Sequence, residues 1–435
     1  MGIKGSYKMY LPALAVLLLL SGICAASAAS AAPAAGTGSG PEYEWIEYIS
    51  TYCDDNSTVS NVTISSIEVL DDGTYIAGGK DDSGRAVFGL DKSGNIVWVK
   101  KISGGDADGS VRFVEKSPDG SVYLFTDGEN LIKLENASAD AREVWTYHVP
   151  LGAISSIEVL DDGNVLMGGD FLQSFLTMVG TDGQEVWNRS LGNPAGGGQF
   201  RLRSVQTGND GKYVVTGYVD PIYYENAYRA FAMEINATGG DVWNQQYQTE
   251  NVSIFFTSVA AMGDGGYAVG ALESPMGEVA EGSEGEADAV YQPYLVILDK
   301  DGKAISKKAM NEVDFIYNIQ KAADGGLFLL CGKTKGPEEV EHVVVKTDSA
   351  GNVDWLKSFD TMRVRSIQPL SDNSLLTLLY DEDTGNSVII KTEPSKPVKP
   401  AQSGAKQSPG FAVTSVFAAL AAVGGVFALV GRKNE

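Results

Sequence analysis

Hydrophobic and polar residues alternate in short runs along most of the chain, and these runs recur in blocks. The clearest block, residues 65–102, reads SSIEVLDDGTYIAGG, a short spacer, and AVFGLDKSGNIVWVKKI. Each run alternates with a period of two, which is typical of a β-strand, and the Asp-Gly pairs between runs favour tight turns. One block therefore predicts four short strands.

The block recurs seven times between Ser65 and Lys391, in steps of 43 to 60 residues. Its first turn falls at Gly73, Gly120, Gly163, Gly211, Gly265, Gly325 and Asn373. A period of about 40–50 residues with four strands is typical of a β-propeller blade. We therefore predict an all-β fold in which residues 42–392 form a seven-bladed β-propeller. Glycine pairs such as Gly78-Gly79 and Gly168-Gly169 are expected to let neighbouring inner strands approach closely.

The seventh block ends after its third strand and lacks the fourth, which carries a Trp in most blocks. The fourth-strand tryptophans are Trp98, Trp145, Trp187, Trp243 and Trp355. The fifth block has Ile305 near the position of this Trp. The segment EYEWIEY, residues 42–48, reads like the missing strand. We predict that it closes the seventh blade as its outermost strand, so that the ring has no free edge.

The pattern D-x-x-G-x-x-x-W, as in Asp91 to Trp98, resembles the repeats of PQQ-like propellers. That group includes quinoprotein dehydrogenases and a bacterial outer-membrane assembly scaffold. The resemblance implies that each Trp docks between blades. The motif is loosely kept, since the copy ending at Trp187 drops a residue and Lys300-Asp301-Gly302 leads to no Trp. It therefore supports the fold and not a cofactor.

The N-terminus is typical of a secretory signal peptide, which we assign to residues 1–32. Lys4 and Lys8 supply the positive region, residues 11–24 form an apolar helix, and the small residues that follow offer A-x-A cleavage points. Cys24 would suit lipoprotein attachment, but Ile23 before it fits that signal poorly.

The C-terminus predicts a linker and a membrane anchor. Residues 393–408 are rich in Pro, Ser and Lys and are expected to form a semi-extended tether. Residues 411–430 are an uncharged apolar run of 20 residues, which is enough for one transmembrane helix. Arg432 and Lys433 follow it, so we expect this end to face the cytoplasm.

Residues 409–435 resemble the PGF-CTERM sorting signal of archaeal surface proteins. The resemblance rests on the triplet Pro409, Gly410 and Phe411, the apolar span and the basic end, in that order. It implies that an enzyme of the archaeosortase type cuts near the triplet and moves the protein onto a lipid, much as in a GPI signal. The alternative is a plain single-span anchor. Both interpretations place the ring on the outer face of the cell membrane, at the cell surface.

Composition argues against several classes of function. The net charge of −23 repels nucleic acid and anionic lipid headgroups, so we expect no nucleic-acid partner. His148 and His342 fall in different blades, and no set of residues suggests a metal site or a catalytic triad. Asp299 to Lys303 imitates a calcium loop, but its twelfth position is Met310. We therefore expect no catalytic residue, cofactor or metal, and in particular no quinoprotein dehydrogenase activity.

Six sequons for N-linked glycosylation are present. Their asparagines are Asn56, Asn61, Asn136, Asn188, Asn236 and Asn251. If the ring lies outside the cell, we expect some of them to carry sugar.

We predict a non-catalytic, surface-anchored propeller that serves as a binding or scaffold module. Two insertions, residues 219–228 and 273–292, both join a second to a third strand and should emerge on one face of the ring. That face is expected to bind an unknown protein or polymer. A scaffold within the surface lattice (S-layer) of an archaeon is one alternative. Another is an extracellular quinoprotein-like oxidoreductase or hydrolase, which buried carboxylates converging on the axis would favour and a small, apolar axis would oppose.

Overall fold

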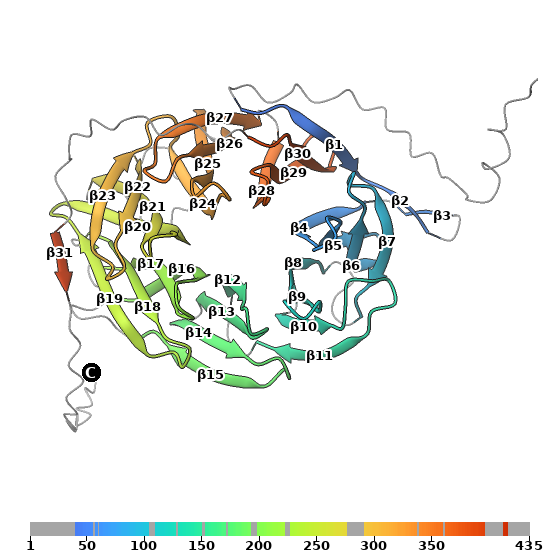
Figure 1. Ribbon diagram of the computed structural model, residues 1–435, viewed down its shortest axis with the longest axis horizontal. Helices are drawn as coiled ribbons and strands as arrows, with labels where there is room; N and C mark the ends of the chain where they lie inside the picture. Colours follow the sequence, from blue (N-terminus) through green and yellow to red (C-terminus); the bar gives the residue numbers. More distant parts are fainter. Residues whose placement is uncertain are drawn as a thin grey trace, which may run out of the picture.

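The computed structural model describes residues 40–54, 57–59, 61–103, 109–127, 129–149, 153–170, 173–192, 198–221, 227–275, 291–336, 339–359, 362–395 and 412–415. All regular elements within these residues are β-strands. Seven antiparallel sheets surround a central axis, and Figure 1 shows them as the blades of a ring. The predicted seven-bladed propeller is confirmed.

Each blade has four strands, numbered here from the axis outwards. Blade 1 contains β4 (Thr63–Val69), β5 (Tyr75–Asp81), β6 (Gly84–Leu90) and β7 (Ile96–Lys101). Blade 2 contains β8 (Val111–Lys116), β9 (Val122–Thr126), β10 (Asn130–Leu134) and β11 (Glu143–His148). Blade 3 contains β12 (Ala153–Val159), β13 (Val165–Asp170), β14 (Ser174–Val179) and β15 (Glu185–Ser190).

The remaining blades follow the same plan. Blade 4 contains β16 (Phe200–Thr207), β17 (Tyr213–Val219), β18 (Arg229–Ile235) and β19 (Asp241–Gln248). Blade 5 contains β20 (Val252–Ala261), β21 (Tyr267–Pro275), β22 (Gln292–Leu298) and β23 (Ala304–Ala309). Blade 6 contains β24 (Phe315–Lys321), β25 (Leu327–Gly336), β26 (Glu339–Thr347) and β27 (Val353–Phe359). Blade 7 contains β28 (Met362–Pro369), β29 (Leu375–Asp381), β30 (Ser387–Thr392) and β1 (Tyr43–Ile49).

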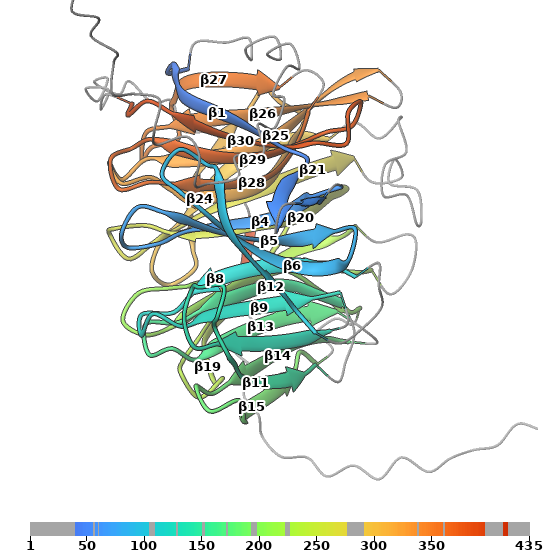
Figure 2. The ribbon, with the colours of Figure 1, turned by 90° about the vertical axis from the view of Figure 1, so that its right-hand side faces the viewer.

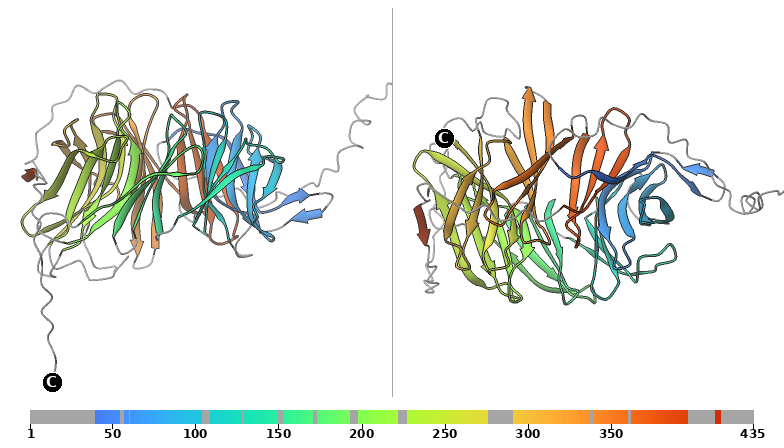
Figure 3. Two further views of the ribbon diagram at one scale, coloured as in Figure 1. Left: turned by 90° about the horizontal axis from the view of Figure 1, so that it is seen from below. Right: turned by 45° about the horizontal axis from the view of Figure 1, so that its top comes forward.

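The two ends of the propeller are joined in blade 7. Strand β1 pairs antiparallel with β30, with Ile46 opposite Ile390. The ammonium of Lys391 lies 2.7 Å from Oε2 of Glu44 and adds an ion pair to this seam. Inner strand β28 then contacts β4 of blade 1. The prediction that the segment around Trp45 closes the ring is therefore confirmed. A hairpin of β2 (Tyr52–Asp54) and β3 (Ser57–Val59) projects from the rim nearby (Figures 1 and 3).

The recurring turn has the geometry that its residues predict. All seven turn residues, six glycines and Asn373, have positive φ between 64° and 91°. In the first copy, the amide of Gly73 donates to the carbonyl oxygen of Leu70 over 2.9 Å. Glycine adopts this backbone conformation at no steric cost, and Asn tolerates it better than most residues.

Apolar packing between blades forms the core. Each of seven buried clusters combines the facing sheets of two neighbouring blades, and together the clusters complete the ring. Glycine pairs make this packing close. A Cβ on Gly78 would lie 2.6 Å from Cγ1 of Val111 in the next blade, and one on Gly168 would lie 2.8 Å from Leu202. The inner strands therefore crowd together as expected, and Figure 2 shows the stacked sheets from the side.

The outer-strand tryptophans dock on the following blade, as the resemblance to PQQ-like repeats implies. Each of three indole Nε1 groups donates to a carbonyl oxygen in the next blade's third hairpin: Trp145 to Thr181 (2.9 Å), Trp187 to Ala237 (3.0 Å) and Trp243 to Lys300 (2.9 Å). The rings also pack on the positive-φ glycine of that hairpin, for example Gly183.

Blade 5 departs from this pattern. The register places Ser306 opposite Ile297, which is the position that Trp occupies elsewhere. Ile305, expected near that place, is 59% exposed. Leu295 instead lies against the next hairpin, because a Cβ on Gly351 would be 2.7 Å from its Cδ2.

The terminal segments lie largely outside the described residues. These include the predicted signal peptide (1–32), most of the linker (393–408) and the triplet Pro409, Gly410 and Phe411. Of the predicted membrane helix, only β31 (Ala412–Ser415) is described, and it pairs with β19 at the rim (Figure 1). Within the described residues, no helix has the length and apolar character needed to cross a membrane.

Candidate functional site: the central channel and the insertion face

Every inner strand contains a β-bulge at the same position. One residue of each strand has no partner on the neighbouring strand. These residues, which we call the mouth layer, are Ser65, Arg112, Ser155, Arg203, Thr257, Tyr317 and Arg365. A bulge bends its strand and re-aims its side chains. The bulges therefore repeat one local change around the axis and determine which side chains line it.

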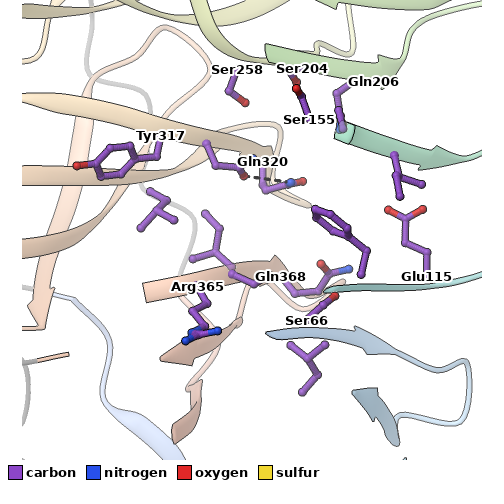
Figure 4. A pocket seen from close by; sticks show the side chains of 18 of the residues that line it. Ser66, Glu115, Ser155, Ser204, Gln206, Ser258, Tyr317, Gln320, Arg365 and Gln368 are labelled. Carbon is purple, nitrogen blue, oxygen red and sulfur yellow. Dashed lines mark hydrogen bonds between the residues drawn. The ribbon is translucent and has the colours of Figure 1, made fainter. Parts of the chain in front are cut away.

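Two further layers follow along the inner strands. The residue after each bulge forms a hydroxyl layer: Ser66, Phe113, Ser156, Ser204, Ser258, Asn318 and Ser366. Two residues further on lies a carboxyl-amide layer: Glu68, Glu115, Glu158, Gln206, Ala260, Gln320 and Gln368. Most of these side chains line a central cavity of about 380 Å³ (Figure 4). The channel is therefore polar over most of its circumference.

The hydroxyl layer joins neighbouring blades. The backbone amide of Val114 donates to Oγ of Ser66 over 3.2 Å, and that of Ile319 donates to Oγ of Ser258 over 3.1 Å. Each bond connects one inner strand to the next. Some of these hydroxyls thus hold the ring together as well as lining the cavity.

Two glutamates of the carboxyl-amide layer join blades in the same way. The amide of Val159 donates to Oε2 of Glu115 over 2.9 Å, and the amide of Thr207 donates to Oε1 of Glu158 over 3.0 Å. Glu68 accepts a 3.1 Å hydrogen bond from the side-chain amide of Gln368 in blade 7. All three glutamates have fixed partners on an adjacent blade.

Burial among protein atoms shifts the titration of these carboxyls. It raises the pKa of Glu68 from 4.5 to about 7, although Lys116 opposes the shift. Burial, followed by the charges of Glu158 and Glu68, raises the pKa of Glu115 well above its ordinary value. Burial also raises the pKa of Glu158. Near neutral pH, this layer therefore carries less negative charge than three ionised carboxylates would.

Sequence reasoning expected no such convergence of carboxyls. The signal was present, because Glu68 and Glu158 occupy the same place in two nearly identical SSIEVLDDG copies. The described residues contain no group of three His, Cys, Asp or Glu arranged to hold a metal ion.

A row of aromatic side chains lies on the face that carries the loops between second and third strands, which we call the insertion face. Its members, the aromatic arc, extend from blade 4 to blade 6: Tyr228, Tyr218, Phe255, Tyr291, Phe315, Tyr317 and His342. Successive ring centroids are 5.1 to 6.4 Å apart. All are partly exposed, and Tyr317, 43% exposed, brings the arc to the channel mouth.

Two arginines of the mouth layer stand beside aromatic rings. The guanidinium of Arg203 lies 5.1 Å from the ring centroid of Tyr218 and donates to its hydroxyl over 2.9 Å. The guanidinium of Arg365 lies 4.5 Å from the ring centroid of Tyr380. Both arginines are exposed and line the cavity.

The two histidines are not brought together. His148 is exposed on the outer strand β11, where its Nδ1 lies 3.2 Å from Oδ1 of Asn130. His342 ends the aromatic arc in blade 6, stacked on Tyr317. Burial and the charge of Arg363 lower the pKa of His342, so it is neutral near pH 7.

The described sequon asparagines are all exposed. Asn136 and Asn236 lie in hairpins, and Asn61 and Asn251 have positive φ. Asn188 lies on outer strand β15, where its Nδ2 donates to Oγ1 of Thr177 over 3.1 Å. The remaining sequon asparagine, Asn56, lies outside the described residues. Sugar attachment stays a prediction at each position.

The two insertions are described only at their ends. Strands β17 and β18, and likewise β21 and β22, are antiparallel neighbours. Their connecting loops therefore leave the same face of the ring, as predicted. Residues 222–226 and 276–290 lie outside the described part, whereas Tyr228 belongs to the aromatic arc.

Comparison with known proteins identifies neighbours in fold. No protein-family model matches the chain, and no curated protein matches it. Among solved structures, hydrazine synthase of Kuenenia stuttgartiensis is similar with a TM-score of 0.55 and 14% identity, over 76% of this chain and 96% of that one. The WD40 β-propeller domain of Doa1 has a TM-score of 0.51 and 10% identity, over 82% and 98%. BamB from Moraxella catarrhalis has a TM-score of 0.43 and 17% identity, over 83% and 95%. At these identities the likeness shows the fold alone, a β-propeller that known proteins use for different ends.

Proposed function

We propose that the protein is a non-catalytic binding module whose insertion face captures an extended partner, either a protein or a polymer. The observation that carries this proposal is the aromatic arc. Its side chains come from three blades and follow one another across the face into the channel mouth. Aromatic side chains offer large contact area at low conformational cost and are enriched where proteins bind partners.

The arrangement of the arc indicates an extended partner. A compact ligand would need rings that enclose one pocket, whereas these rings form a row. Phe255 contacts Tyr218 on one side and Tyr291 on the other, at 5.1 and 6.4 Å between ring centroids. A chain lying along the row would contact several rings in turn.

The proposal includes a location at the cell surface. It rests on the sequence of the two ends: the signal-like N-terminus, the tether and the apolar segment after Pro409, Gly410 and Phe411. We propose export, anchoring through the C-terminal segment, and processing by an archaeosortase-type enzyme. Mass spectrometry of the protein from its native envelope tests this part. A mature chain that keeps residues 1–32 would contradict export, and one that keeps residues 412–435 would contradict processing.

Binding is tested with arrays of soluble polysaccharides and peptides. Wild-type protein is compared with the Phe255→Ser/Tyr291→Ser variant, which removes the middle of the arc. The control is Val97→Ser, which removes an apolar side chain 61% exposed on outer strand β7. We expect the arc variant alone to lose binding while its melting temperature stays near that of the control. No bound probe for the wild type, or the same probes for the arc variant, would contradict the proposal.

One observation favours a second candidate, an extracellular hydrolase. Glu68 and Glu115 line the channel, Glu158 lies close enough to Glu115 to affect its charge, and all three have raised pKa values, as carboxyls that serve as general acids do. Against this, Glu115 and Glu158 each accept a backbone amide of the next blade, which gives them a structural role. Release of reducing ends from polysaccharides by the wild type, abolished in Glu68→Gln, would favour the hydrolase over the binding module.

A further inference from the structure

We propose that the central channel binds a carboxylate-bearing sugar unit of an acidic polysaccharide, with Arg203 and Arg365 contacting the carboxylate and the two deeper layers contacting the hydroxyls. The inference deepens the proposed binding function and rests on it. It specifies the chemistry of the partner at the point where the aromatic arc enters the channel.

The two arginines of the mouth layer that line the cavity favour an anionic group in the ligand. Arg203 and Arg365 belong to blades 4 and 7, with blades 5 and 6 between them on one side and blades 1 to 3 on the other. They therefore approach the channel from different sides. Neither guanidinium forms an ion pair within the described part of the chain, although Glu382 lies near Arg365. A guanidinium fork matches a carboxylate in a bidentate geometry, and both arginines line the cavity with donors that no carboxylate of the described residues occupies.

The hydroxyl layer and the carboxyl-amide layer favour a ligand with many hydroxyl groups. Hydroxyls of Ser204 and Ser258 and side-chain amides of Gln206 and Gln320 line the cavity (Figure 4). Amide and carboxyl groups both accept hydrogen bonds from hydroxyls, and the amides also donate. Ser258 already accepts from the amide of Ile319, and Gln320 already donates to the side chain of Asn318, but each keeps further hydrogen-bonding capacity toward the cavity. A sugar acid would engage that capacity and the arginines together, whereas a lone carboxylate or phosphate would engage only the arginines.

The size and placement of the cavity fit a sugar unit attached to a chain. Its volume of about 380 Å³ lies within the range of about 300–1,000 Å³ that is usual for ligand pockets. Tyr317 belongs both to the cavity lining and to the aromatic arc. Sugar rings pack their apolar faces on aromatic side chains, so one chain could extend from the channel along the arc.

The overall charge of −23 opposes an anionic partner, but salt limits this repulsion to charges near the site. Electrostatic interactions between exposed charges are largely screened beyond about 10 Å at 0.1 M ionic strength. The raised pKa values of Glu68 and Glu115 also reduce the negative charge below the mouth. A carboxylate that binds the two arginines therefore meets less opposing charge from the layer below them.

Isothermal titration calorimetry with defined saccharides tests the inference on the full propeller. The probes are an oligogalacturonide, the galactose oligosaccharide of equal length, galacturonic acid and inorganic phosphate. We expect the oligogalacturonide to bind and its neutral counterpart to bind at least about tenfold more weakly, because the carboxylate contacts are missing. Binding of galacturonic acid would identify the single unit as sufficient, and its failure beside a bound oligomer would assign the rest of the affinity to the arc.

Arginine variants locate the site. Arg203→Gln/Arg365→Gln is expected to weaken binding of the oligogalacturonide by at least about tenfold. The control, Arg142→Gln, removes one guanidinium charge from an exposed arginine of blade 2 that pairs with Glu135 and should bind as the wild type does. Equal binding of the acidic and neutral oligosaccharides, phosphate binding as tight as that of the oligomer, or unchanged binding by the double variant would overturn the inference.

The same experiment separates this inference from the proposed function. If the wild type binds no acidic saccharide but still binds another polymer or peptide through Phe255 and Tyr291, only the channel inference fails. If the arc variant also leaves all binding unchanged, the proposed function fails with it.

Discussion

The indole of Trp187 in blade 3 donates to the carbonyl oxygen of Ala237 in blade 4 over 3.0 Å. The equivalent indole of Trp355 in blade 6 has no such acceptor, because the third hairpin of blade 7 is replaced by the two ends of the propeller. Its Nε1 is buried without a hydrogen-bond partner, and its ring packs beside Gly40. Tryptophan at equivalent positions of two blades thus packs at both interfaces but forms an inter-blade hydrogen bond at only one of them.

This difference predicts unequal costs for the same substitution. Trp187→Phe should lower the free energy of unfolding by about 1 kcal/mol more than Trp355→Phe does, since it alone loses a hydrogen bond. Both variants lose the same ring atoms, but Trp355 is buried and Trp187 is only partly buried, so the packing lost at Trp355 offsets part of the difference. Urea unfolding of the propeller measures the two losses. Equal losses would show that the hydrogen bond contributes little to docking.

Closure of the ring by β1 predicts the effect of removing it. Deleting residues 42–49 exposes the edge of β30 and uncovers side chains of the cluster between blades 6 and 7, including Ile390. We expect faster hydrogen exchange in β30 and β29, a lower melting temperature, and self-association through the free edge, seen by size-exclusion chromatography. Slow exchange in β30 and a monomeric deletion variant would contradict this role.

The control for that deletion keeps β1 and removes only its ion pair. Glu44→Gln breaks the contact with Lys391, but the Glu44 side chain is 44% exposed. Exposed ion pairs contribute about 0–1 kcal/mol, so the variant should unfold nearly as the wild type does. A loss as large as that of the deletion would assign closure to the charges and not to the strand.

The fold could be predicted from the sequence further than the site could. The spacing of Gly73, Gly120 and their equivalents gave the blade count because a turn with positive φ restricts its residues strongly. The β-bulges were not predicted, since an extra residue in an inner strand leaves a run such as SSIEV looking regular. Aligning the blocks by their turns would have placed Arg203 and Arg365 in one column. The aromatic arc joins residues of three blades, and no pattern along the chain brings Phe255 near Tyr291.

The position of each sequon, in a hairpin or within a strand, predicts which of them carry sugar in protein isolated from its native envelope. Asn136 and Asn236 lie in hairpins with their side chains exposed. Asn188 lies within a strand and donates its Nδ2, the atom that a glycan would occupy, to Thr177. We expect higher occupancy at Asn136 and Asn236 than at Asn188, measured by glycopeptide mass spectrometry. Asn236→Gln should remove one glycan mass, and full occupancy of Asn188 beside empty hairpin sites would contradict the expectation.

The carboxyl of Glu68 predicts how stability depends on pH. Burial raises its pKa from 4.5 to about 7 in the folded protein. A carboxyl whose pKa is raised on folding contributes stability that is fully present below the unfolded pKa and is lost as pH rises through the folded pKa. The propeller should therefore lose stability between about pH 4.5 and 7, with Glu68 contributing about 1–3 kcal/mol of that loss. Glu115 and Glu158 act in the same direction.

Urea unfolding of Glu68→Gln at several pH values measures this contribution. The amide keeps the shape and accepts a hydrogen bond but does not ionise, so the variant should show a shallower loss of stability across this window and should exceed the wild type at pH 8. Glu135→Gln is the control, because Glu135 is a surface residue paired with Arg142, and this partner lowers its pKa. Because the pKa of Glu135 is lowered in the folded protein, its carboxyl makes the protein less stable as pH falls below about 4.5, outside the range in which Glu68 acts. A Glu68→Gln profile parallel to that of the wild type would contradict this prediction. It would show that folding does not raise the pKa of Glu68, so that this carboxyl is ionised in the folded channel between about pH 4.5 and 7.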